Sequence, residues 1–496
     1  MTDLFGRDFD VLVIGGGING CGVARDASMR GLKVLLVERD DLASGTSGRS
    51  SRLIHGGIRY LEQGRLHLVY ESIRERQILL RIAPHLVKPL AFTWPIYRGA
   101  RVGKLKLSAG LFVYQLMARG RSRPHLTLDA AETIEREPSL KNAGLAGGAV
   151  YYDACTDDAR LTVANAVAAK QNGAAVTTHT SVTELLFENG KAIGAVLKPK
   201  YSGERYEIRT RVVVNTTGVW ANAFGGGAGG RRHRGSKGVH IALPRDRVGN
   251  RDALTLISPI DGRVMFCLPA GPQTIIGTTD TWTEEPPETV HAAPSDVDYL
   301  LGSANAYFDR ARLTTDDVVS AWAGIRPLAI GTGTNPSAAS REHSIVADNS
   351  GVINVTGGKL TTYRSMAAEV VDLVQRSMGQ KREPAPTDSV MLPGSDRADK
   401  IAQLQLEDAA LATPLVEGLP YTRSHLVYGV REELALTLSD LLIRRSHLAF
   451  ETRDHGVGVA ARAAEIVAPL LGWTTEMKSA HIQQYRLDVE RMFAIG

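Results

Sequence analysis

The chain has few cysteines and lacks long apolar runs. Its three cysteines, Cys21, Cys155 and Cys267, are more than a hundred residues apart. No pair has the spacing of a redox motif or a zinc site, so we expect neither a disulfide framework nor a bound metal. No run of 18 apolar residues predicts a membrane-spanning helix. The first residues run into an apolar strand without the pattern of a signal peptide, and we therefore expect an intracellular protein.

A surplus of one charge is also missing. Lysine and arginine number 58 and aspartate and glutamate 53, a net charge of +5 that does not by itself indicate nucleic acid binding. The hydrophobic share of 43% and the charged share of 22% are typical of globular proteins, which excludes disordered and fibrous classes. The 496 residues suffice for several domains, and the 50 glycines predict tight turns or close approaches of the backbone to a ligand.

A βαβ unit is predicted over the first forty residues. The apolar run VLVIG at 11–15 is typical of a buried strand, and the residues after it have helical spacing as far as Gly31. A second buried strand, KVLLVE, follows at 33–38. This order places the turn between the first strand and the helix at the edge of a parallel sheet.

That turn carries a dinucleotide fingerprint. Gly15, Gly17 and Gly20 match G-x-G-x-x-G, and Glu38 ends the second strand eighteen residues after Gly20. The glycines permit a tight turn, close approach of a pyrophosphate and close packing of helix on strand, while the acid accepts hydrogen bonds from ribose hydroxyls. The sequence therefore predicts that this unit binds FAD or NAD.

Two later segments favour FAD. VVVNTTGVWAN at 212–222 and GVINVTGGKLTTYR at 351–364 are apolar strands that run into small residues and a helix start. Glycines there, Gly218, Gly357 and Gly358 among them, would let the backbone approach a flat isoalloxazine ring. A second fingerprint, as an additional NAD site would need, is absent: GGGAGG at 225–230 has no strand running into it, and we interpret it as a loop.

The rest of the chain changes character twice. Short β-like runs dominate from about 174 to 280. The segment 381–395 contains three prolines and many polar residues, which is typical of a linker. Helical periodicity dominates after it, so we expect a separate helical domain over 396–496.

Several motifs together resemble one family. The chain is similar to FAD-dependent, quinone-linked glycerol-3-phosphate dehydrogenases and to the related glycerol-3-phosphate oxidases, and the similarity extends along its whole length. The motifs that carry the resemblance are IGGGINGCGVARDASMRG (14–31), RSSRLIHGGIRYLE (49–62), NTTGVWAN (215–222), KGVH (237–240), IIGTTDT (275–281), WAGIRPL (322–328), GGKLTTYR (357–364) and LIRRSHLAF (442–450).

The resemblance implies an α/β fold. It predicts a Rossmann-like FAD-binding domain of the amino-acid-oxidase type, interleaved with an antiparallel-sheet substrate domain and followed by a C-terminal helical domain. The expected boundaries are 1–85, 145–235 and 315–380 for the FAD-binding domain, 86–144 and 236–314 for the substrate or cap domain, 381–395 for the linker and 396–496 for the helical domain.

The resemblance also implies an activity. Members of the family oxidise sn-glycerol 3-phosphate to dihydroxyacetone phosphate by hydride transfer to FAD, and the dehydrogenases pass the electrons to a membrane quinone. We therefore expect a cytoplasmic protein held peripherally on the inner face of the cell membrane. Two alternatives stay open: an oxidase that uses dioxygen and releases hydrogen peroxide, and a flavin-binding protein without turnover. The oligomeric state is also open, a homodimer included.

Oxidation of a secondary alcohol needs a base for the hydroxyl proton. His55, within LIHGG, is the first candidate because imidazole titrates near neutral pH and the adjacent glycines allow close packing beneath the ring. His240, within KGVH, is the competing candidate and is otherwise expected to bind substrate. For either histidine, a purely structural hydrogen bond is the alternative.

A phosphate monoester needs cations. Arg59, Arg326 and Lys359 each lie inside one of the family motifs, beside glycine or proline, and we expect them in the active site. Lys359 has a second predicted role, the stabilisation of negative charge on the flavin. We further expect hydroxyl contacts from two groups, Tyr60, Thr279 and Tyr363 toward the substrate and Thr46 and Ser47 toward the FAD pyrophosphate.

A basic segment lies between 98 and 123. It contains seven arginines and lysines and no acid, around the apolar stretch KLSAGLFVYQLMAR. Lys104, Ser108, Gln115 and Arg119 fall on one side of a helical wheel, which is typical of a helix on an anionic membrane surface. A solvated face packed on the protein is the equal alternative. The segment lacks zinc-ligand spacing and RNA-binding motifs, so we do not expect nucleic acid.

Overall fold

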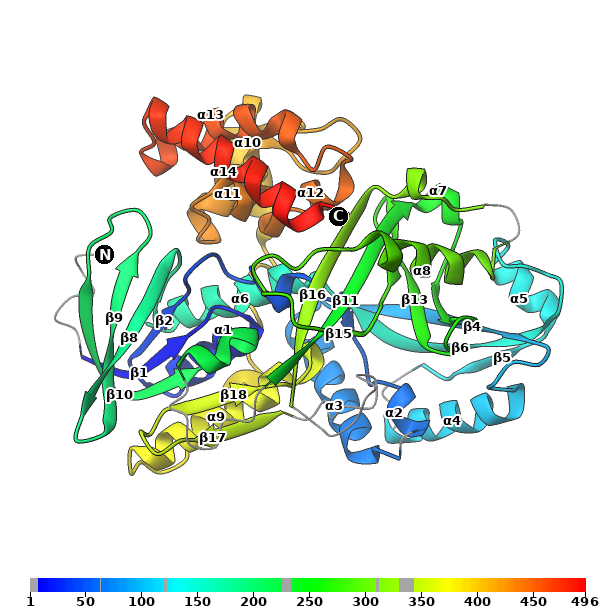
Figure 1. Ribbon diagram of the computed structural model, residues 1–496, viewed down its shortest axis with the longest axis horizontal. Coiled ribbons are helices and arrows are strands. Elements are labelled where there is room, and N and C mark those ends of the chain that lie inside the picture. The colour runs from blue at the N-terminus through cyan, green and yellow to red at the C-terminus, as the bar shows by residue number, and fades with distance from the viewer. Residues whose placement is uncertain (1–7, 63, 119–122, 225–232, 309–311, 330–342) are drawn as a thin grey trace.

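The computed structural model describes residues 8–62, 64–118, 123–224, 233–308, 312–329 and 343–496 (Figure 1). The predicted βαβ unit is present as β1 (Phe9–Ile14), α1 (Ile18–Met29) and β2 (Val34–Val37). These strands belong to a sheet with the order β17-β18-β10-β1-β2-β7, in which β1 pairs in parallel with both β2 and β10. The other members are β7 (Ala175–Thr177), β10 (Tyr206–Asn215), β17 (Ser344–Ala347) and β18 (Ile353–Thr356).

Apolar residues on successive positions of β1 cover both faces of this sheet. Val11 and Val13 pack into one core with α1, α6 (Asp158–Gln171) and α9 (Tyr363–Ser377). Leu12 and Ile14 point to the opposite face and pack into a core with the hairpin strands β8 (Thr180–Glu188) and β9 (Lys191–Pro199). Burial on both faces explains why the strand is a continuous apolar run rather than an alternating one.

Gly20 sets the distance between α1 and the sheet. A Cβ atom on Gly20 would lie 1.9 Å from the carbonyl oxygen of Gly15 and 2.6 Å from Oγ1 of Thr216. The helix therefore packs directly on the turn after β1 and on the residue that follows β10. The third fingerprint glycine thus holds the helix start at the carboxyl ends of the strands.

A second sheet lies beside the first (Figure 1). Its order is β15-β11-β14-β13-β12-β4-β6-β3, with β16 paired to β11 and β5 paired to β6. The pairing is antiparallel apart from β12 with β4. Its strands are β3 (Leu53–Ile54), β4 (Lys88–Tyr97), β5 (Leu126–Leu128), β6 (Leu145–Cys155), β11 (His233–Pro244), β12 (Ala253–Ile257), β13 (Val264–Ala270), β14 (Gln273–Gly277), β15 (Thr281–Thr283) and β16 (Ser320–Ala329).

Helices border the second sheet. α8 (Pro294–Asn305) packs Leu300 and Leu301 into a core with β11 and β12. Near the first motif loops lie α2 (Arg59–Glu62), α3 (Leu66–Ile82) and α4 (Lys104–Met117), whose Leu107, Leu111 and Tyr114 pack with Tyr60 and Val69. Two short helices, α5 (Ala130–Arg136) and α7 (Arg245–Val248), complete this half.

The last hundred residues form the expected helical domain, which covers both sheets at the top of Figure 1. It contains α10 (Arg397–Glu407), α11 (Arg423–Glu432), α12 (Leu448–Glu451), α13 (Ala460–Leu471) and α14 (Thr475–Phe493). Phe450 and Phe493 pack edge to face at 5.0 Å, and Phe450 packs in the same way on Trp322 of β16. The helical domain thus shares a core with the second sheet.

An ion-pair joint connects the helical domain to the first sheet. Asp41, shortly after β2, accepts hydrogen bonds from both terminal nitrogens of Arg445, at 2.7 and 2.8 Å, and from Arg444. Asp440 pairs with Arg444 at 2.8 Å and with Nε2 of His179 at 3.0 Å. Asp41, His179 and Asp440 each have an atom that could bind a metal ion, and these atoms lie within 4.8 Å of one another. Because the arginines already neutralise both carboxylates, we interpret this cluster as a domain joint.

The segment 381–395 is packed rather than extended in solvent. Thr387 donates a hydrogen bond to Asp26 of α1, and the carbonyl of Val390 accepts one from Arg25. The amide of Leu392 donates to the carbonyl of Ile82, and the Leu392 side chain is buried. The chain between the two parts is therefore anchored along α1 and α3. The glycine run 225–230, interpreted above as a loop, falls outside the described residues.

The joint predicts a pH-dependent stability. Burial opposes a charged His179, but the Asp440 carboxylate outweighs it, so the pKa of His179 is raised overall. A raised folded-state pKa contributes stability that is complete below the ordinary histidine pKa of about 6.5 and is lost as the pH rises through the folded value. We therefore expect the free energy of unfolding to fall more steeply above pH 6.5 in the wild type than in His179→Gln, measured by urea unfolding from pH 6 to 9.

The control for this measurement is His67→Gln. His67 is an exposed residue of α3, and its replacement should keep the wild-type slope. Parallel stability curves for the wild type and His179→Gln would show that the imidazolium does not strengthen the joint.

Candidate active site

A cavity of about 500 Å³ lies where the two sheets meet. Its first wall is built by the residues that follow parallel strands: Gly15 and Gly17 after β1, Glu38 after β2, Thr216 after β10 and Gly357 after β18. Ligands of open parallel sheets bind at this carboxyl edge. The other wall comes from the second sheet and includes Gly238, His240, Val264, Phe266, Gly324 and Arg326.

The acid of the fingerprint is held beside the glycine turn. The Glu38 carboxylate accepts hydrogen bonds from the amides of Gly16, at 2.6 Å, and Asp40, at 2.8 Å. Burial raises the pKa of Glu38, and the two amides oppose that rise. The carboxylate therefore lies where the acid of a dinucleotide fold meets ribose hydroxyls.

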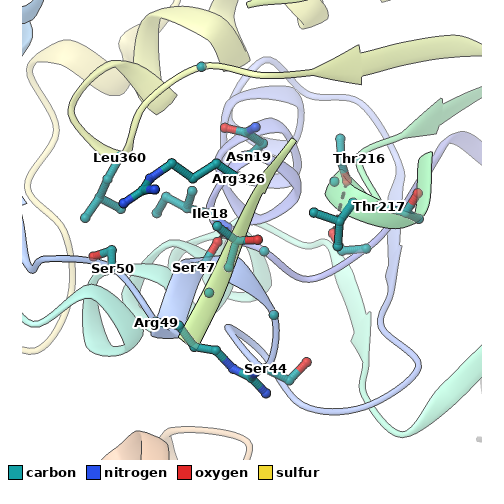
Figure 2. Close-up of a pocket in the computed structure, with 18 of the residues that line it drawn as sticks. Ile18, Asn19, Ser44, Ser47, Arg49, Ser50, Thr216, Thr217, Arg326 and Leu360 are labelled. Atoms are coloured by element: carbon teal, nitrogen blue, oxygen red, sulfur yellow. Dashed lines mark hydrogen bonds between the residues drawn. The ribbon is translucent and has the colours of Figure 1, made fainter. Parts of the chain in front are cut away.

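The start of α1 and Arg49 make the neighbouring part of the cavity suitable for an anion. The amide of Ile18, in the first turn of α1, donates to Oγ of Ser47 at 2.9 Å. Nε of Arg49 is buried without a hydrogen-bond partner among the described residues, and burial, Arg491 and Arg444 lower the pKa of Arg49 to about 10. Figure 2 shows Arg49 beside Ser44, across β16 from Ile18 and Asn19. Arg49 and the start of α1 both line the cavity, and a helix N-terminus with a cation in the same lining suits the pyrophosphate of a flavin dinucleotide.

Cationic side chains gather at the other end of the cavity. Arg326 extends from β16 toward Leu360 (Figure 2), donates to Oγ1 of Thr278 at 3.1 Å and lies 3.5 Å from Asp280. Nζ of Lys359 lies 4.2 Å from the centre of the Tyr60 ring and 3.2 Å from Oγ of Ser72. Arg326 thus reaches this end of the cavity from the second sheet, and Lys359 reaches it from the loop after β18 of the first.

Both candidate histidines line this end of the cavity. The backbone amide of His55 donates to Oγ1 of Thr361 at 3.1 Å, and its ring lies edge to face with Phe266 at 6.5 Å. His240 stacks on Trp322 at 5.5 Å, and its Nε2 lies 2.8 Å from Oγ of Ser51.

The charge state of His240 follows from its surroundings. Burial, and then the guanidinium groups of Arg326 and Arg52, lower the pKa of His240 to about 3. The ring is therefore a neutral imidazole at neutral pH, able to form hydrogen bonds but weak as a proton acceptor.

Most of the predicted site residues meet in this one cavity. Its lining includes thirteen of them: Gly15, Gly17, Glu38, Thr46, Ser47, His55, Tyr60, Gly218, His240, Arg326, Gly357, Gly358 and Lys359. Gly20 lies behind the turn, as described above. The hydroxyl of Thr46 donates to the carbonyl of Ile325 at 2.7 Å, so this predicted cofactor residue also fastens its loop to β16.

Besides Gly20, three predicted residues are not part of the described lining. Oγ1 of Thr279 accepts the amide of Val239 at 3.0 Å, and the side chain is buried in the sheet. Tyr363 is fully buried at the start of α9, where Asn165 donates to its hydroxyl at 3.0 Å. Neither residue lines the cavity, and the substrate contacts expected of their hydroxyls stay predictions. The side chain of Arg59 lies outside what the structure describes.

The cavity also contains residues that were not predicted. Arg49 is the first residue of the motif at 49–62, and its charge among small polar residues is a signal that could have identified it. Thr278 is the neighbour of the predicted Thr279. Val264 and Phe266 come from β13, whose sequence RVMFCL carries no signal beyond that of a strand. Only the pairing of β13 with β14 brings these side chains to the cavity.

Comparison with known proteins covers nearly the whole chain. A family model described as FAD dependent oxidoreductase matches residues 10–370, and a model of the C-terminal domain of alpha-glycerophosphate oxidase matches 394–478. Glycerol-3-phosphate dehydrogenase 2 of Mycobacterium tuberculosis is 38% identical, over 98% of this chain and 88% of its own. The aerobic glycerol-3-phosphate dehydrogenase of Staphylococcus saprophyticus is 34% identical, over 98% and 95%.

Solved structures of similar fold lead to the same family. The glycerol-3-phosphate dehydrogenase of Bacillus halodurans, complexed with FAD, matches with a TM-score of 0.77 and 28% identity over 99% of this chain and 96% of its own. An L-alpha-glycerophosphate oxidase from Mycoplasma pneumoniae shares the fold, with a TM-score of 0.60 at 18% identity. The predicted fold class and the FAD cofactor are confirmed. With relatives this similar along nearly its whole length, the chain belongs to the glycerol-3-phosphate dehydrogenase family of FAD-dependent oxidoreductases.

Proposed function

We propose that this protein oxidises sn-glycerol 3-phosphate to dihydroxyacetone phosphate and passes the electrons to a membrane quinone. One observation carries the proposal: the cavity lined by the dinucleotide fingerprint is also lined by two cations, Arg326 and Lys359. Arg326 comes from β16 of the second sheet, and Lys359 from the loop after β18 of the first. Bound FAD supplies the acceptor for the hydride that leaves the carbinol carbon. The remaining tasks, holding the phosphate and removing the hydroxyl proton, belong to side chains.

Arg326 and Lys359 hold the phosphate in this proposal. A guanidinium presents paired donors to phosphate oxygens, whereas an ammonium acts as a point charge. Thr278 and Asp280 support the Arg326 side chain, at 3.1 and 3.5 Å, and fix its direction. Lys359 lies over the Tyr60 ring and lines the cavity, so its ammonium can approach the substrate or the flavin.

His55 takes the hydroxyl proton and His240 orients the hydroxyl. The lowered pKa of His240 disfavours it as the proton acceptor, because a base with a pKa near 3 gives little driving force at neutral pH. His55 lines the same cavity, and Thr361 fixes its backbone. With His240 disfavoured, the His55 imidazole is the candidate base that we propose.

The outer face of α4 is proposed to contact the membrane. Beyond the exposed Lys104 and Lys106 of its first turn, this helix exposes large apolar side chains: Leu105 is 86%, Phe112 60% and Leu116 68% exposed. Two residues of the predicted polar stripe contact the protein itself: Ser108 contacts Thr127, and Gln115 forms a hydrogen bond with His125. Arg119 falls outside the described residues.

Cations lie at one end of this apolar face. Arg98 and Arg101 precede α4, Lys104 and Lys106 are in its first turn, and Glu62 pairs with two of the four, Arg101 and Lys106, at 3.1 Å each. Apolar side chains next to cations suit an anionic bilayer surface. Among the described helices, none combines the length and apolarity that crossing a bilayer requires. Docking through α4 would place the membrane near Tyr60, because both pack in one core.

The activity is tested by mixing the anaerobic holoenzyme with sn-glycerol 3-phosphate. We expect the flavin absorbance to bleach, and a ubiquinone analogue to restore it faster than dioxygen does, with little hydrogen peroxide formed. The enantiomer sn-glycerol 1-phosphate is the control and should bleach the band far more slowly. Persistence of the yellow colour would contradict the proposed oxidation, and rapid peroxide formation would replace the quinone by dioxygen.

Loss of the Arg326 guanidinium should affect the phosphorylated substrate selectively. Charged hydrogen bonds contribute about 1.5–3 kcal/mol, so Arg326→Ala should raise KM for glycerol 3-phosphate by about ten- to a hundredfold. KM for unphosphorylated glycerol should change much less, as steady-state kinetics on both substrates would show. Arg247→Ala, which removes an exposed arginine of α7, is the control. Equal losses on both substrates would contradict phosphate anchoring.

Flotation with lipid vesicles tests the membrane surface. The triple variant Leu105→Ser, Phe112→Ser and Leu116→Ser should bind phosphatidylglycerol vesicles at least about tenfold more weakly than the wild type, since each inserted apolar side chain contributes roughly 1.5–3 kcal/mol. Leu406→Ser, which replaces an 88% exposed leucine of α10, is the matched control and should bind normally. Unchanged flotation of the triple variant would remove α4 from the docking surface.

A further inference from the structure

A buried polar network lies beneath the His55 segment, outside the cavity lining. Its centre is Asp153 on β6, whose carboxylate is almost completely buried. Oδ1 of Asp153 accepts the backbone amide of Gly56 at 3.1 Å, the hydroxyl of Tyr114 at 2.7 Å and a guanidinium hydrogen of Arg76. Arg76 also donates to the carbonyl of Tyr152 at 3.0 Å. Three separate segments of the chain therefore converge on one carboxylate oxygen.

Gly56 packs directly on this network. A Cβ atom at this position would lie 2.2 Å from the hydroxyl oxygen of Tyr114 and 2.6 Å from Cγ1 of Ile73. The backbone of the His55 segment therefore approaches the network as closely as a chain without a side chain allows. A small displacement of Asp153 or Tyr114 must move Gly56, and with it the neighbouring His55.

His55 is thus held on two sides. On one side, Thr361 accepts its amide at 3.1 Å and donates to its carbonyl at 3.3 Å. On the other side, Asp153 holds the next amide, that of Gly56. Thr361 follows the GGK loop of the first sheet, whereas Asp153 belongs to the second sheet. The backbone that carries the imidazole is therefore fixed from both sheets.

An ion pair serving only stability would not require this arrangement. Buried ion pairs contribute little net stability compared with apolar residues of the same size, because desolvation offsets the attraction. An apolar side chain at position 153 would, however, leave the Gly56 amide without its acceptor. The distinctive property of Asp153 is therefore its hydrogen bond to the segment that carries His55.

We propose that Asp153 is a positioning residue of the active site, and that with Arg76 and Tyr114 it fixes the His55 imidazole against the substrate and the flavin. The proposal rests on the proposed function of His55 as the base. Asp153 does not touch the cavity, so it acts through the backbone of Gly56 rather than on the reacting atoms. Displacement of a base by about 1 Å costs as much as a hundredfold in rate.

A double-mutant cycle on the holoenzyme tests this. Anaerobic stopped-flow mixing with sn-glycerol 3-phosphate gives the limiting rate of flavin reduction and the substrate Kd. Asp153→Asn should lower the rate by roughly ten- to a hundredfold and change Kd by less than about threefold. In a His55→Gln background the same change should lower the rate by less than about twofold, because residues that act through one group are not additive.

The matched control is Glu75→Gln. Glu75 pairs with Arg364 at 2.6 and 2.7 Å in an ion pair about as buried as that of Asp153, and its carboxylate forms no hydrogen bond to the His55 segment in the part of the chain that the structure describes. This variant should lose stability and keep the rate of flavin reduction within about twofold, which separates a general loss of a buried charge from mispositioning.

Each outcome decides between the proposals. An equal loss from Asp153→Asn in both backgrounds, or none in the wild type, would overturn the positioning role while leaving His55 as the base. An unchanged rate in His55→Gln would instead overturn the proposed base and the positioning role with it. If Asp153→Asn fails to bind flavin, Tyr114→Phe replaces it: a loss of about threefold or more that vanishes with His55→Gln supports the proposal, and no loss overturns it.

Discussion

The parallel alignment of β1, β2, β10 and β18 is the constraint on which the site depends. Parallel strands place all their carboxyl ends at one edge, so the segments that follow them meet although those after β1 and β18 are separated by more than three hundred residues. The strands β1, β2 and β10 are apolar on both faces and are buried by helices on one side and a hairpin layer on the other. The apolar core therefore determines where the polar residues of the cavity converge.

The second sheet turns this nucleotide edge into a cavity that can hold a substrate. Pairing of β11 with β16 puts His240 opposite Trp322 and Ser236 opposite Arg326, and both histidine and arginine then face the strand ends of the first sheet. The helical domain holds this geometry from outside, through Phe450 on Trp322 and through the Asp41 joint. Helix α4 has two faces with different tasks, since Tyr114 points to Asp153 and Phe112 to solvent.

Local patterns predicted the first sheet well because its signals are short in sequence. The βαβ unit, its glycines and Glu38 lie within forty residues, and periodicity places them correctly. Thr279 and Tyr363 lie outside the cavity lining for a different reason: a motif gives the residue type, but the turn after β14 and the first turn of α9 decide which side chains line the cavity. The contribution of β13 and the convergence on Asp153 depend on pairing between distant strands, which no local pattern encodes.

The balance of charge in the cavity explains how two histidines can have different tasks. Arg326 and Arg52 help to lower the pKa of His240, but burial is the largest cause. A phosphate dianion beside Arg326 would offset the guanidinium charge and raise the pKa of His240 toward its ordinary value, whereas the burial contribution would remain. His240 is neutral at neutral pH in the absence of the phosphate, and in the proposed mechanism its ring holds the hydroxyl while His55 accepts the proton. The proposed division of labour thus depends on the burial of His240 against Trp322, and the cations proposed to hold the phosphate reinforce it.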